Sequence, residues 1–296
     1  MLFAANFKIV LMAAGFAVPL AMTSAVPGGN RDIAAFKDQP ALIELATGSV
    51  LYRVAGDFTR NGKPAQAPLA TIRMTRPLAI MKHQVSSADY QRCVAEKACR
   101  TLPPDIAVAA DRPAVMVSWR DADAYAAWLS RKTGEPYRLP TDEEWAYAAG
   151  SRYRDDSLPV DGNDPSKGWL ARYARESSLK SEEIDSKPRP LGAFGANENG
   201  LLDVAGNVWE WTSTCFVRTK LDENSQAISK NSNCGVRVAE GQHRTYVTDF
   251  IRDARAGGCA AGVPPSNLGF RLVREPKSWV GQLSSGLSKA LSIARS

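Results

Sequence analysis

Histidine is scarce in this sequence: the chain of 296 residues has two, His83 and His243, beside five cysteines. Zinc, haem and non-haem iron sites draw mostly on histidine and cysteine ligands, so few such sites are possible. A strong charge of one sign is also lacking, because 37 Lys and Arg against 31 Asp and Glu leave a formal net charge of +6. Spread over the whole chain, this excess is too weak to indicate a nucleic-acid partner.

Long apolar runs are lacking too. The run from Ile9 to Met22 is broken by glycine and proline and is shorter than the roughly 20 residues of a spanning helix. Lys8 precedes it and the small residues Thr23 to Ala25 follow, which predicts a signal peptide over 1–25. The alternative is a buried N-terminal helix. Export predicts a periplasmic or secreted protein with no transmembrane segment after signal cleavage.

In an oxidising compartment, cysteines are first interpreted as disulfides. Cys93 and Cys99 are too far apart for a bridge along one unbroken helix, so a bridge requires the helix to end between them. The alternative is that Cys93 is buried as a small hydrophobic residue. Cys215 and Cys234 flank a polar segment and are predicted to close it as a loop. Cys259 would then be unpaired, although it could instead pair with either of these two.

Short helices and strands are scattered along the chain. Residues 41–58 alternate apolar and polar side chains between glycines, which predicts short strands. A first helix is predicted after Ser86 and a second after Ser118, with Gly134 as its stop. A capping box at Thr141–Glu144 begins a third. We therefore expect one α+β domain that is rich in irregular structure.

Two terminal segments flank this domain. Residues 26–40 contain a Pro-Gly-Gly sequence and are expected to form a flexible leader. Residues 276–296 repeat large apolar side chains every four positions, which is typical of an amphipathic helix. That helix is expected to pack on its own domain, with docking on a partner or a membrane surface as the alternatives.

Three strings carry a family resemblance. They are RPAVMVSWRDADAYAAWLSRKTGEPYRLPTDEEWAYAAG at 112–150, NGLLDVAGNVWEWTS at 199–213 and SNLGFRLVRE at 266–275. In order and spacing they resemble the formylglycine-generating enzymes, also called the sulfatase-modifying-factor family. The resemblance covers about residues 41–275. It implies a single irregular, loop-rich α+β domain that is distantly related to C-type lectins.

The resemblance also implies a structural calcium site in DVAGNVWE. Its ligands would be the side chains of Asp203 and Glu210 and the carbonyls of Gly206 and Val208. A turn at this point can aim carboxylates and carbonyls inward together, as a hard cation requires. The alternative is that the two carboxylates cap local turns and pair with arginines.

The catalytic segment departs from the family. Formylglycine-generating enzymes use two cysteines ahead of the SNLGFR string to bind copper and activate oxygen. The matching segment here, about Gln242 to Val247, has no cysteine, and Cys259 lies too late in the sequence. We therefore expect neither copper nor formylglycine formation by the family mechanism. The iron site of the related ergothioneine-pathway enzymes is not expected either, because the chain lacks its histidine pair.

Polar residues in this segment are the candidates for another chemistry. His243 is a candidate acid or base near neutral pH, and Tyr246 a candidate proton donor, with Glu240 beside them. Arg252 is a candidate clamp for a carboxylate or phosphate. The alternative is that these groups form a structural salt-bridge network.

Exported members of the superfamily without the cysteine pair suggest the function. The ending GCAAGVPPSNLGFRLVRE resembles the NirV group, which is accessory to copper nitrite reductase in denitrification. We therefore expect an exported accessory or maturation factor that serves a periplasmic oxidoreductase. One alternative is an oxidase acting on a small molecule or peptide, similar to a pyoverdine-maturation protein. Another is a calcium-stabilised binding module.

Overall fold

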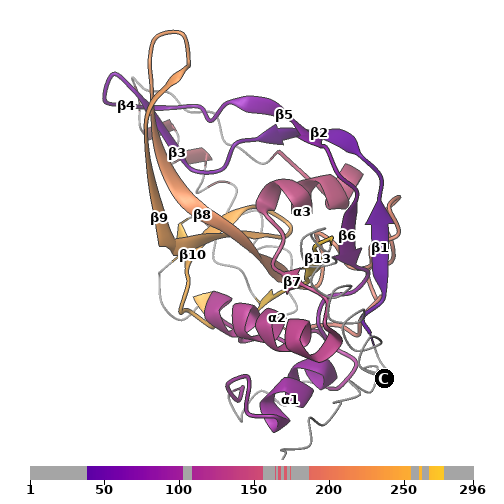
Figure 1. Ribbon diagram of the computed structural model, residues 1–296. Helices are drawn as coiled ribbons and strands as arrows, with labels where there is room; N and C mark the ends of the chain where they lie inside the picture. The colour runs from indigo at the N-terminus through magenta and orange to yellow at the C-terminus, as the bar shows by residue number, and fades with distance from the viewer. Residues whose placement is uncertain are drawn as a thin grey trace, which may run out of the picture. The chain divides into compact units, whose positions relative to one another are not determined.

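The computed structural model describes residues 39–102, 109–155, 187–254 and 267–276, with short pieces at 164, 166–167, 170–171, 174 and 260–261 (Figure 1). Contacts divide the chain into residues 1–34 and 35–296, and every described residue belongs to the second unit. The expected signal peptide, nearly all of the leader and nearly all of the C-terminal helix lie outside the described residues. Cys259 lies outside them as well.

The described part of the chain is a mixed α+β domain, as the sequence predicts. The helices are α1 (Ser87–Ala95), α2 (Trp119–Thr133) and α3 (Asp142–Ala149), with a 3₁₀ turn, η1 (Gly150–Arg152), after α3. The first six strands are β1 (Leu42–Leu45), β2 (Gly48–Arg53), β3 (Asp57–Arg60), β4 (Lys63–Ala65), β5 (Leu69–Met74) and β6 (Leu78–Met81). The others are β7 (Tyr137–Arg138), β8 (Trp209–Leu221), β9 (Ala227–Glu240), β10 (Thr245–Thr248), β11 (Ala260–Ala261), β12 (Leu268–Gly269) and β13 (Val273–Arg274).

The strands form three sheets. One has the order β1-β6-β13-β7, and a second is the β2-β5 pair. The largest has the order β11-β10-β9-β8-β3-β4, with β12 pairing in parallel to β8. Early and late strands are neighbours in two of these sheets, where β6 pairs with β13 and β3 pairs with β8. No helix in the described ranges is long and apolar enough to cross a membrane.

The helix starts follow local capping chemistry. Ser86 caps α1 by accepting from the backbone N–H of Asp89. Capping boxes begin α2 at Ser118 and α3 at Thr141, and α2 ends at Gly134 in the left-handed conformation. The predicted starts of the three helices and the predicted end of α2 are confirmed. They could be predicted because each boundary is determined by a few adjacent residues.

The segment between Cys215 and Cys234 was expected to be a polar loop, and this expectation was wrong. It forms the outer halves of β8 and β9, which pair antiparallel around a tight turn at 222–226 (Figure 1). Most of outer β9 is exposed on both faces, so the sequence there lacks the apolar alternation of a half-buried strand. Ladder hydrogen bonds to β8, with the Cys215–Cys234 disulfide, hold outer β9 in place of core packing.

The core surrounds the three strings that carry the family resemblance. Trp145, Trp211 and Phe270, one from each string, are at most 1% exposed. Each tryptophan also donates its indole N–H to a buried acceptor: Trp145 to Glu210 and Trp211 to the Val117 carbonyl. The core therefore fixes the ends of β8, β9 and α3, where the polar cluster described next is found.

Candidate functional site

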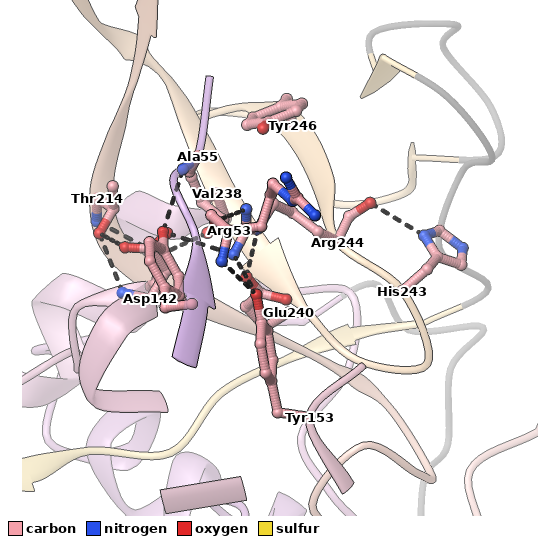
Figure 2. Close-up of polar contacts among 12 residues, drawn as sticks. Arg53, Ala55, Asp142, Tyr153, Thr214, Val238, Glu240, His243, Arg244 and Tyr246 are labelled. Atoms are coloured by element: carbon pink, nitrogen blue, oxygen red, sulfur yellow. Dashed lines mark hydrogen bonds and ion pairs between the residues drawn. The ribbon is translucent and has the colours of Figure 1, made fainter. Parts of the chain in front are cut away.

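A buried polar cluster lies where β9, β2 and the start of α3 meet (Figure 2). Its cation is Arg244, whose side chain is 9% exposed. Arg244 Nε donates to Glu240 Oε1 at 2.7 Å, and Nη2 lies 3.9 Å from Asp142 Oδ2. Both carboxylates are almost fully buried, at 3% and 2% side-chain exposure. One guanidinium is thus shared between two buried acids.

Neutral groups hold the Arg244 guanidinium in place. Nη1 donates to the Arg53 carbonyl at 2.7 Å, and Nη2 to the Tyr153 hydroxyl at 3.3 Å. The guanidinium carbon lies 4.9 Å from the centre of the Tyr52 ring, within cation–π range. Arg244 therefore links three segments that are far apart in the sequence.

Asp142 is fixed independently of the arginine. It accepts from the Tyr52 hydroxyl, and from Thr214 Oγ1 at 2.5 Å. Its own backbone N–H donates to Thr214 Oγ1 at 3.0 Å, and the Ala55 N–H donates to the Tyr52 hydroxyl at 3.2 Å. The first residue of α3 is thereby bound to β2 and β8.

The buried location shifts the pKa values of the groups in the cluster. Burial, followed by the charge of Asp142, raises the pKa of Tyr52 far above its usual range. Burial raises the pKa of Tyr153 and brings that of Tyr246 to about 12. Burial alone would lower the pKa of Arg244, but the Glu240 carboxylate keeps it well above its ordinary value. At neutral pH the phenols are protonated and the guanidinium is charged.

Tyr246 also lines an open pocket at the root of the β8–β9 hairpin, here called the hairpin pocket. Its cavity volume is about 540 Å³. The Tyr246 hydroxyl accepts from the Gly56 N–H at 2.8 Å, and its ring meets Phe216 edge-on at 5.1 Å between centroids. Arg218 lies 5.7 Å from the Phe216 centroid. Asp57, Asn231 and Asn233 complete the polar wall. The pocket combines ring faces with a cation, a carboxylate and amides.

The other predicted catalytic residues have different surroundings. His243 is 7% exposed, with Nδ1 at 3.1 Å from the Arg244 carbonyl oxygen and its ring against Trp209. Arg252 pairs with Asp121 of α2 at 2.7 and 2.8 Å. Glu240 is buried beside Arg244, and Tyr246 opens onto the hairpin pocket. The structure therefore brings Glu240 together with an arginine but gives the four candidates no common open cleft among the described residues.

Asp203, the first predicted calcium ligand, caps a turn. It is 0% exposed, and its two carboxylate oxygens accept from the backbone N–H groups of Gly192 and Phe194 at 2.5 and 2.8 Å. The carboxylate is thus directed at the 192–194 backbone. Its carbonyl and that of Gly206 both lie 3.4 Å from Gln84 Nε2.

Glu210, the other acidic ligand, is surrounded by donors. Arg271 donates to its two oxygens at 2.6 and 2.7 Å, Gln84 Nε2 to Oε1 at 2.8 Å, and Trp145 Nε1 to Oε2 at 2.9 Å. An ionised carboxylate offers about four acceptor positions, and these donors use all of them. In this arrangement Glu210 offers no position to a dication, because a donor would first have to leave.

Comparison with known proteins shows the family of this chain. Residues 30–276 match the family described as "Sulfatase-modifying factor enzyme 1-like domain". The chain belongs to this family. The formylglycine-generating enzyme of Mycobacterium tuberculosis is 39% identical over 195 residues, which are 59% of this chain and 61% of that one. That of Streptomyces coelicolor is 32% identical over 181 residues, 58% of this chain and 55% of that one. The chain therefore aligns with only part of the length of these curated relatives.

A solved structure shares the fold of this sulfatase-modifying-factor member. PvdO from Pseudomonas aeruginosa superposes with a TM-score of 0.51 at 22% identity, covering 81% of this chain and 96% of that one. In the segment that the resemblance expects to match the cysteine pair of the family, this chain has Arg244 and Tyr246. Within the described ranges, no three His, Cys, Asp or Glu side chains gather in a way that could hold a metal ion.

Sequence reasoning missed half of the polar cluster. Tyr52 and Asp142 are bonded to each other across 90 positions, and no local pattern marks either as buried. In the sequence, Asp142 has the pattern of an ordinary acidic residue in the first turn of a capped helix. The two predicted disulfides, Cys93–Cys99 and Cys215–Cys234, are both present.

The family resemblance predicts calcium at Asp203 and Glu210, whereas the donors around Glu210 predict no binding, and thermal unfolding tests these two expectations. A cation held at 100 times its Kd would stabilise the protein by about 2.7 kcal/mol, or about 5–10 °C in a domain of this size. Because Arg271 already neutralises Glu210, we expect calcium and EDTA to leave the unfolding midpoint unchanged, with magnesium as the control. A calcium-specific rise that disappears in Glu210→Gln would show instead that the motif rearranges to bind the ion.

Proposed function

We propose that this protein is an exported accessory factor that binds a periplasmic oxidoreductase, or that enzyme's substrate, and does not generate formylglycine. The observation that carries the proposal is the hairpin pocket beside a segment that has no thiol. Where the family enzymes use two cysteines, this chain has a buried Arg244–Glu240 pair and the pocket tyrosine Tyr246. A reaction that depends on copper thiolates has no ligands there, whereas binding needs none.

The pocket chemistry suits recognition of a polar or aromatic group. Arg218 is exposed and its planar guanidinium can clamp a carboxylate. The Phe216 and Tyr246 rings offer apolar faces, and the amides of Asn231 and Asn233 can read hydrogen-bonding groups. The pocket lies on the hairpin strands β8 and β9, which extend away from the helices (Figure 1).

Names of relatives are consistent with roles other than formylglycine formation. A bovine relative, 32% identical over 170 residues, is named "Inactive C-alpha-formylglycine-generating enzyme 2". A relative from Paenibacillus barcinonensis, 34% identical over 103 residues, is named "Chaperone protein LppX". These names support an accessory role for this chain without identifying its partner.

Calorimetric titration against purified copper nitrite reductase, in its apo and copper-loaded forms, tests the proposal. We expect binding to at least one form, and a loss of about tenfold in affinity, or about 1.4 kcal/mol, in Arg218→Glu. Arg131→Glu makes the same charge change on the exposed end of α2 and should bind like the wild type. Equal losses in both variants would show that net charge, not the pocket, determines binding.

A second assay tests whether the protein forms formylglycine, the activity that the proposal excludes. The protein is incubated with copper, oxygen and a sulfatase-derived cysteine peptide, and aldehyde is detected by hydrazide labelling. We expect no aldehyde above that of a protein-free control. Aldehyde formed in proportion to enzyme would overturn the argument from the missing cysteines.

A further inference from the structure

The two disulfides differ in how an external thiol can reach them. Cys93 and Cys99 are 0% and 8% exposed, within the core that α1 and α2 cover. Cys215–Cys234 instead crosses the β8–β9 hairpin where the ladder register is irregular, with Cys234 exposed and Cys215 half-buried. A thiolate in solution can therefore approach Cys234 directly.

A fixed cation lies against the other sulfur. Arg237 Nη1 donates to Cys215 Sγ at 3.2 Å and to the Ser213 carbonyl at 2.7 Å. The guanidinium carbon lies 3.9 Å from the centre of the Trp119 ring, so stacking holds the group in place. An arginine does not lose its charge in proteins, and the positive group therefore faces Cys215 at any physiological pH.

This arrangement distinguishes the two sulfurs chemically. A cation next to a cysteine lowers the pKa of its thiol, because it stabilises the thiolate. In thiol–disulfide exchange, the sulfur with the lower thiol pKa leaves faster. Cys234 is thus the accessible sulfur for attack, and Cys215 is the better leaving group.

We propose that Cys215–Cys234 is a redox-active disulfide that exchanges with external thiols, independently of the function proposed above. The thiolate of the external thiol attacks Cys234 Sγ and forms a new S–S bond with it. The Cys215–Cys234 bond breaks, and its electron pair stays on Cys215 as a thiolate beside Arg237. When the donor is a dithiol, its second thiolate attacks the mixed disulfide and releases Cys234. The donor leaves as a disulfide, and this protein has gained two electrons.

Differential alkylation in glutathione and dithiothreitol buffers of graded potential tests the proposal on the folded full chain. Peptide mass spectrometry then measures the reduced fraction of each cysteine. We expect Cys215 and Cys234 to open at a less reducing potential than Cys93 and Cys99. We also expect the glutathione adduct on Cys234. Opening of both bridges together, or an adduct mainly on Cys215, would overturn the proposal.

Variants of Arg237 separate its electrostatic role from accessibility alone. Arg237→Gln should slow reduction about threefold, as expected for a leaving thiol whose pKa rises by about one unit, while Arg237→Lys should keep most of the rate. Lys220→Gln, also on the hairpin, is the matched control, because it removes an exposed charge that does not line the hairpin pocket. Equal reduction rates in Arg237→Gln and the wild type would contradict the assigned role of the cation. If Arg237→Gln fails to fold, the proposal is still tested by which of the two disulfides is reduced first in the wild type.

Discussion

Replacing Arg271 by methionine should lower the free energy of unfolding by about 3–5 kcal/mol, because it leaves a charge buried without its counter-ion. Arg271 and Glu210 are both 0% exposed and share two hydrogen bonds. In the variant, Glu210 would keep only the neutral donors of Gln84 and Trp145. Urea unfolding followed by circular dichroism measures the change.

Two further variants show whether the buried charge is the cause. In Glu210→Gln/Arg271→Met the charge is gone, so we expect recovery of more than half of the lost stability. Arg274→Met, three residues further along the chain in β13, breaks a pair whose glutamate is 69% exposed, and it should cost less than about 1 kcal/mol. Equal effects of Arg271→Met and Arg274→Met would refute the argument.

The parts of the fold that could be predicted are those encoded by neighbouring residues. The starts of α2 and α3 were found because a capping box lies within four positions, and Gly134 marks the end of α2 by its backbone conformation alone.

What could not be predicted depends on contacts between distant segments. The motif around Glu210 suggests a cation ligand, but nothing near it shows that Arg271 lies against the carboxylate. Outer β9 has no apolar alternation, so its ladder with β8 had no signal in the sequence. His243 was singled out as a rare and titratable residue, although rarity does not reveal that its ring packs on Trp209.

The buried cluster predicts a second large effect, in Arg244→Met. That change removes the guanidinium from between Glu240 and Asp142, which are almost fully buried. We expect a loss of about 3–5 kcal/mol at neutral pH, again measured by urea unfolding. Lys132→Met is the control, because both partners of the Lys132–Glu96 pair are exposed, at 38% and 43%, and the change should cost less than about 1 kcal/mol.

The pH dependence distinguishes a charge effect from simple loss of packing. Without Arg244, the folded-state pKa of Glu240 should rise above its unfolded value of about 4.3. A carboxyl with a raised folded-state pKa stabilises the folded protein while it is protonated, and this contribution is lost as the pH rises through that pKa. The deficit of Arg244→Met relative to the wild type should therefore be smaller at pH 5 than at pH 8, by about 1.4 kcal/mol for each unit of raised pKa above 5. In Glu240→Gln/Arg244→Met the difference between the deficits at pH 5 and pH 8 should shrink. A deficit of Arg244→Met that is identical at both pH values would contradict the argument. The guanidinium would then contribute packing and hydrogen bonds but no charge compensation.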